Sequence, residues 1–148
     1  MAGLSLKVTI PDAAAFQRRL SPGSLLRDPV AELLRRAAEE GATAAREAGK
    51  GGSISSSIGF ESGAESARVF SSLPQPLANV MEAGRRPGAQ MPPPDVFGGG
   101  PEGFLIARAV GRRGIKGRFF MRKAKAHLRR IMPTLIEQAS DDIEGRFK

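Results

Sequence analysis

Hydrophobic and polar residues alternate over the first ten positions of the chain. Aliphatic side chains stand at every even position from Leu4 to Ile10, with polar residues between them, which is the two-residue period of a half-buried strand. Pro11 ends this strand. A short helix is expected over 12–20, and the Ser-Pro-Gly sequence at 21–23 stops it.

The pattern changes to a helical period in the next segment. From Val30 to Ala48 the apolar residues recur at steps of three and four, and charged residues fill the opposite face. Asp28 is the expected N-cap, Pro29 the first helical residue, and the Gly-Lys-Gly-Gly sequence at 49–52 ends the helix. The apolar stripe shrinks from leucine to alanine and glycine, so we expect another backbone to approach its C-terminal half closely.

Two β-prone segments follow this helix. Apolar residues share one parity over 53–61, from Ile54 to Phe60, and a second segment covers 68–73. The Ser-Gly sequence at 62–63 predicts a turn between them. We therefore expect an antiparallel hairpin.

Proline and glycine punctuate the second half of the chain. After a short helical or extended segment over 77–83, residues 84–103 hold five prolines and six glycines, which predicts a long flexible loop. A short helix is expected over 104–113, with Phe104 and Leu105 among its apolar residues and Gly114 as its stop.

A long amphipathic helix over 119–147 completes the chain. Its apolar stripe includes Phe120, Ala124 and Leu128, and Pro133 inside it predicts a kink. Together the elements predict an α+β fold in which a small antiparallel sheet packs against helices. The length of 148 residues fits a single domain over 1–148.

The composition removes several kinds of chemistry. There is no cysteine and only one histidine, His127, which excludes disulfides, thiolate metal sites and sites with several histidines. The absence of Trp and Tyr leaves little material for stacking nucleic-acid bases. Gly98–Gly103 matches a dinucleotide-binding string, but no strand precedes it and Pro101 has no N–H for a phosphate. We therefore expect no enzyme activity, no catalytic residue, no cofactor and no metal, and His127 is interpreted as a structural or surface residue.

The net charge of +8 comes from one segment. Between Glu102 and Glu137 there are ten basic residues and no acidic one, whereas the rest of the chain has 13 basic against 15 acidic residues. Solvated helices usually interleave acids with bases to form pairs one turn apart. The segment therefore indicates a contact surface for phosphates or for an acidic protein, although two solvated helix faces would give the same count. Glu82 lies in an apolar segment, and an ion pair with Arg85 or Arg86 is expected.

Two short motifs and their order resemble a known family. The first is the Leu-Ala-Asn-Val-Met-Glu-Ala-Gly-Arg sequence at 77–85, and the second runs from Ala-Arg-Ala-Val to Phe-Phe-Met-Arg-Lys-Ala at 107–124, before the long helix. The order resembles the tail-completion, or neck, family of minor tail proteins of long-tailed bacteriophages, over roughly 28–147. Leu77 stands where that family usually has an aromatic residue, and Phe97 is nearest to the family's usual tryptophan.

The resemblance implies a ring-forming structural virion protein, present in the neck or tail and assembled in the bacterial host cytoplasm. By analogy six subunits would form the ring and join the head and portal to the tail tube, next to other neck, connector and tail-tube proteins. DNA would pass through the ring, with possible non-specific contacts, and no membrane is involved. The alternative is a small basic protein that binds nucleic acid without sequence specificity. The expected contact residues are Arg108, Arg112, Arg113, Lys116, Arg118, Phe119, Phe120, Arg122, Lys123, Arg129 and Arg130, with Glu82, Arg85 and Arg86 in the loop.

Overall fold

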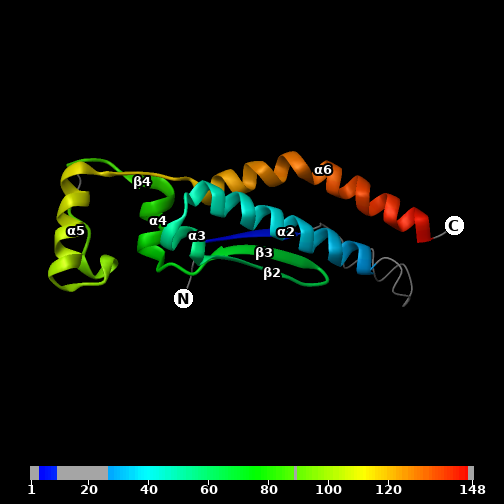
Figure 1. Ribbon diagram of the computed structural model, residues 1–148, viewed down its shortest axis with the longest axis horizontal. Helices are drawn as coiled ribbons and strands as arrows, with labels where there is room; N and C mark the ends of the chain where they lie inside the picture. The colour runs from blue at the N-terminus through cyan, green and yellow to red at the C-terminus, as the bar shows by residue number, and fades with distance from the viewer. Residues whose placement is uncertain (1–3, 10–26, 89, 147–148) are drawn as a thin grey trace.

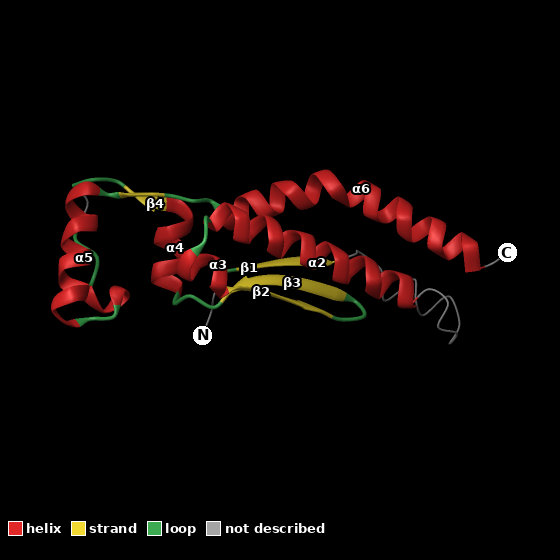
Figure 2. Ribbon diagram, viewed as in Figure 1, coloured by secondary structure: helices red, strands yellow, loops and turns green. Residues whose placement is uncertain are grey.

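The protein has an α+β architecture, as predicted (Figures 1 and 2). A computed structural model describes residues 4–9, 27–88 and 90–146, so the helix expected over 12–20 lies outside the described residues. The described elements are β1 Ser5–Thr9, α2 Arg27–Gly49, α3 Gly52–Ser57, β2 Ile58–Ser62, β3 Ser66–Ser71, α4 Gln75–Ala83, β4 Gly84–Arg85, the 3-10 helix η1 Pro94–Phe97, α5 Gly100–Arg113, β5 Ile115–Lys116 and α6 Phe120–Arg146.

The main sheet has three antiparallel strands in the order β1-β3-β2. Leu6 of β1 and Phe60 of β2 both pair with Val69 in the central strand β3. The hairpin expected between two β-prone segments is confirmed as β2 and β3. Its turn is closed by the Gly63 N–H, which donates to the Ser66 carbonyl at 2.9 Å.

The first part of the expected strand over 53–61 is wrong, because residues up to Ser57 form helix α3. Ile54 and Ile58 are both buried, and a spacing of four fits one turn of a helix as well as one side of a strand. Serine hydroxyls stabilise the helical alternative. The Ser55 Oγ, for example, donates to the Arg46 carbonyl at 2.7 Å, and such side-chain bonds compete with a strand ladder.

Helix α2 covers one face of the sheet, and α6 packs along α2 (Figure 1). The described part of α2 begins at Arg27, so Asp28 lies in its first turn. A Cβ on Gly41 would stand 2.9 Å from Leu128 Cδ1 of α6 and 3.2 Å from Val69 Cγ2 of β3. The sequence led us to expect another backbone here, but the atoms that approach Gly41 most closely belong to side chains of α6 and β3.

Helix α6 runs unbroken from Phe120 to Arg146 with Pro133 near its middle. Figure 1 shows α6 bending about halfway along, as expected where a proline removes a backbone donor and crowds the preceding turn. The buried residues of α6 are Phe120, Ala124 and Leu128, all before the proline. The half of α6 after the bend therefore adds no buried side chain to the core.

The segment from Gly84 to Gly117, called the arm below, lies at one end of the long molecule (Figure 1). Strands β4 and β5 pair antiparallel, with Gly84 opposite Lys116, and α5 lies beyond them. The loop expected over 84–103 is too long at both ends, since β4 occupies its start and α5 already begins at Gly100. Pro101 in the first turn of α5 is a common way to begin a helix.

The proline-rich part of the arm packs against α5. The Gly88 N–H donates to the Gly111 carbonyl at 2.9 Å, and a Cβ on Gly103 would stand 2.7 Å from the Pro94 carbonyl oxygen. Small residues on one side of α5 thus allow the polypeptide backbone at Gly88, Met91 and Pro94 to lie directly on the helix.

Candidate functional site

A structural joint connects the arm to the rest of the protein, and Glu82 is its central side chain. The carboxylate of Glu82 accepts hydrogen bonds from the backbone N–H groups of Met121 and Arg122, each at 3.0 Å. An acidic group is favourable there, because the first N–H groups of a helix are unpaired and carry the positive end of its dipole. Glu82 therefore caps α6, in place of the expected ion pair with Arg85 or Arg86.

Backbone contacts complete the joint. The N–H groups of Arg118 and Phe119 donate to the carbonyls of Met81 and Glu82 at 2.9 and 3.0 Å. Gly84 has a φ of 78° and a ψ of −177°, and a Cβ there would stand 2.4 Å from the Gly117 nitrogen. The two sequence motifs at 77–85 and 107–124 therefore lie against each other at this joint.

Two expected contact residues instead stabilise the protein's own fold. Phe120 is 0% exposed, so its prediction as a contact residue is wrong, because no partner can reach its ring. The half-buried Arg118 donates from Nη1 to the carbonyl of Gly49. Gly49 is the last residue of α2, so its carbonyl has no hydrogen-bond partner within the helix. Phe119 stays half-buried, and the Arg122 guanidinium lies 4.6 Å from its ring centroid.

Four of the expected basic residues line one shallow hollow at the β4–β5 pair. Arg85, Arg86, Arg113 and Lys116 surround a space of about 500 Å³. The Arg85 Nη2 donates to the Gln90 carbonyl, while within the described part of the chain its buried Nε has no hydrogen-bond partner. A hollow with four cationic side chains attracts anions.

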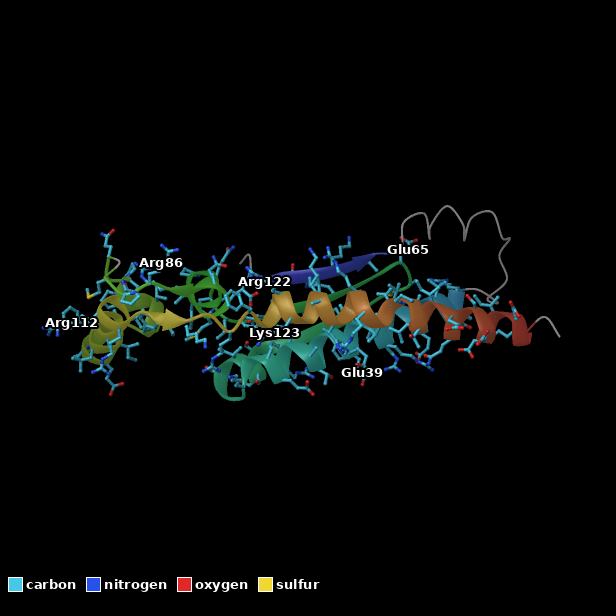
Figure 3. The ribbon with its side chains drawn as sticks, turned by 90° about the horizontal axis from the view of Figure 1, so that it is seen from above. Glu39, Glu65, Arg86, Arg112, Arg122 and Lys123 are labelled. Atoms are coloured by element: carbon cyan, nitrogen blue, oxygen red, sulfur yellow. The ribbon has the colours of Figure 1, made fainter. Side chains whose placement is uncertain are left out.

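The remaining basic residues are exposed on α5 and on the first half of α6. Figure 3 places Arg86 and Arg112 on the arm and Arg122 and Lys123 near the start of α6. Among the residues that the structure describes, none of these four forms an ion pair with a carboxylate. The same holds for Arg108, Arg113, Lys116, Arg118, Lys125, Arg129 and Arg130.

Helix α2 has the opposite arrangement of charges. Arg35 pairs with Glu32 at 2.8 Å and with Glu39 at 2.9 Å, and Arg36 pairs with Glu32 at 2.9 Å. Hydrogen bonds from Arg35 and then Arg36 lower the pKa of Glu32 to about 2. Arg35 and Arg36 are thus paired with acids one turn away. Among the described residues, the basic side chains of α5 and early α6 have no carboxylate partner and are available to other molecules.

Helix α5 carries an exposed apolar surface that was not predicted from the sequence. Phe104, Leu105 and Ile106 are 44%, 62% and 46% exposed, and Met91 beside the helix is 39% exposed. Three consecutive apolar residues cannot share one helical face. The buried face of α5 instead uses Gly103, Ala107, Val110 and Gly111, and this spacing was the sequence feature that could have revealed the exposed residues. Large apolar side chains gathered on a surface mark an interaction site.

His127 connects the two long helices. Its Nε2 lies 3.2 Å from a Glu40 carboxylate oxygen on α2, and its Nδ1 lies 3.2 Å from Arg130 Nη2. These contacts agree with a structural role. Within residues 4–9, 27–88 and 90–146 there is no cluster of three or more histidine, cysteine or acidic side chains that could hold a metal.

The fold and its exposed side chains define a small α+β protein with an arm that is both apolar and basic. No protein-family model, no curated protein and no solved structure matches the chain. In the described ranges no helix is both long and apolar enough to cross a membrane. The function is therefore inferred from the chain's own residues and from the resemblance of its motifs.

Proposed function

We propose that the protein is a structural component of a bacteriophage neck, where it forms a ring that joins the head and portal to the tail tube and lets DNA pass. The observation that carries the proposal is the arm. Its helix α5 leaves Phe104, Leu105 and Ile106 exposed, which is unfavourable in water and is relieved when another protein covers them.

The shape of the molecule also supports assembly. The arm lies at one end of its long axis, and the C-terminus of α6 lies near the other (Figure 1). Subunits that contact each other through two different surfaces close into rings when the rotation between them is right. Six subunits, with neighbouring neck, connector and tail-tube proteins above and below, are part of the proposal by family resemblance.

Labelling in virions tests the proposed location. We expect a tag inserted at Gly63–Glu65, in the exposed turn between β2 and β3, to give added density at the head-to-tail junction in electron micrographs. Phage that lack the protein are expected to yield filled heads and separate tails, and the tagged protein is expected to restore joined particles. Label on the capsid shell or at the tail tip contradicts the proposal, as do joined particles in the protein's absence.

A second function, non-specific DNA binding, is favoured by the hollow that Arg85, Arg86, Arg113 and Lys116 line. If all four neutralise phosphates, the logarithm of the binding constant should fall with the logarithm of salt concentration at a slope of about −3.6, since each phosphate contributes about −0.9. Gel-shift titrations at several salt concentrations measure it. Lys116→Ala should make the slope less steep by about 0.9, whereas Lys7→Ala, on the exposed side of β1, should leave it unchanged. Equal slopes in both variants would reject the hollow as a DNA site.

A further inference from the structure

We propose that α5 of one subunit docks into an apolar groove beside α6 of a second copy of this chain. The inference rests on the proposed ring and names the surfaces that would build it. The groove has a volume of about 430 Å³. Its apolar lining is Leu6 of β1 and Leu128, Met132, Pro133 and Ile136 of α6, and Lys7, Lys125 and Arg129 also line it. Ile136 is 50% exposed, so the groove offers apolar surface that the described residues leave uncovered.

Helix α5 presents a suitable ridge. The most exposed of its large apolar side chains is Leu105, at 62%, and it points away from the buried face at Gly103, Ala107 and Val110. Glu102, Arg108 and Arg112 are also exposed. Glu102 precedes Leu105 by three residues, and Arg108 and Arg112 follow it by three and seven, which places them around the same face. The ridge is therefore apolar at its centre and charged on both sides.

The charges along the two helices are complementary in the same chain direction. On α5 an acidic residue, Glu102, precedes the apolar centre and arginines follow it. On α6 the charges have the opposite order: Lys125 and Arg129 come at the start of the groove, and acidic residues come after it. Parallel packing of α5 on α6 thus places opposite charges at matching levels along the two helices. The acidic residues after the groove are Glu137, Asp141, Asp142 and Glu144, all exposed.

The spacings agree as well as the signs. Arg108 and Arg112 stand three and seven residues beyond Leu105, which is about 4.5 and 10.5 Å along a helix. On α6 the point midway between Met132 and Ile136 is position 134. Three and seven residues beyond it stand Glu137 and Asp141. Leu105 seated in the groove therefore places each arginine level with one carboxylate.

A single subunit cannot make this contact with itself. The arm and the far half of α6 lie toward opposite ends of the molecule (Figure 1), so the ridge of one copy must meet the groove of another. The contact joins two different surfaces, and its repetition builds a ring or a filament. The occupant of the groove is thus a second copy of the chain.

Cross-linking tests the contact directly, because the natural chain contains no cysteine. A Leu105→Cys variant mixed with an Ile136→Cys variant should form a disulfide-linked heterodimer under mild oxidation. The matched control replaces Ile136→Cys with Ser62→Cys, an exposed residue at the end of β2, and should give at least tenfold less product. Equal yields from the two mixtures, or no product from either, would overturn the inference.

Charge exchange supplies a second, independent measurement. The variants Arg108→Glu/Arg112→Glu and Glu137→Arg/Asp141→Arg should each weaken self-association at least tenfold in sedimentation velocity, while circular dichroism verifies that both are folded. Combining all four changes in one chain should restore self-association, since each residue of α5 then again faces a residue of opposite charge on α6. A monomeric wild-type chain at every concentration, or no restoration, contradicts the contact.

The two proposals fail in different ways. If the tag lies at the neck while charge exchange leaves assembly unaffected, the neck function stands and this contact is wrong. If charge exchange restores assembly while the tag lies elsewhere in the virion, the contact stands and the neck function is wrong.

Discussion

Replacing Phe120 by alanine is expected to lower the free energy of unfolding by about 3–5 kcal/mol. The ring is fully buried and belongs to the core cluster that includes Leu34 and Val69, so truncation removes buried contacts and leaves a cavity. Urea unfolding followed by circular dichroism measures the change.

Phe104→Ala is the matched control for Phe120→Ala. It removes the same side chain from a position that is 44% exposed, and we expect a change within about 0.5 kcal/mol together with weaker self-association. If Phe120→Ala instead preserves stability and abolishes assembly, Phe120 is an interface residue and the prediction is wrong.

Gly84→Ala is expected to destabilise the protein by about 3 kcal/mol or more, the sum of backbone strain and overlap. The φ of 78° and ψ of −177° at Gly84 lie in a region that is essentially restricted to glycine. In addition, the new Cβ would stand 2.4 Å from the Gly117 nitrogen and 2.7 Å from the Ile115 oxygen. Backbone atoms cannot rotate away as the end of a long side chain can. Urea unfolding measures the loss, and hydrogen exchange should detect opening of β4 and β5.

Gly51→Ala separates the two causes. Gly51 has nearly the same conformation, with a φ of 78° and a ψ of −171°, but a Cβ there meets nothing within 4 Å. It should therefore cost only the strain, about 1–3 kcal/mol. If both variants lose equal stability, the backbone contact between β4 and β5 contributes nothing to the difference.

The long helices and the hairpin could be predicted because their patterns extend over many residues. The apolar period from Val30 to Ala48 marks α2, and the same kind of stripe marks α6. The stripe of α6 already contains Phe120, so the burial of Phe120 follows from the pattern. The expectation that Phe120 is a contact residue conflicted with this pattern. Helix α3 could not be separated from a strand, since a spacing of four residues fits both.

The joint could not be read from the sequence. Glu82 caps α6 through Met121, which lies 39 residues later in the chain, and no local pattern reports a partner at that distance. The exposure of the apolar residues of α5 could not be predicted for a different reason. An apolar residue in a short helix is expected to face the core, and only the glycine and alanine on the opposite side reveal that it does not.

The direction in which the arm leaves the protein depends on glycine backbone rather than on side chains. Gly84, Gly114 and Gly117 each lie so close to a neighbouring backbone that a Cβ would stand 2.4 to 2.6 Å from it. Substitutions on the outer surface of α5 therefore leave the orientation of the helix unchanged. Over evolutionary time such an arm can acquire new binding partners by exchanging exposed residues, while the geometry of the assembly is inherited intact.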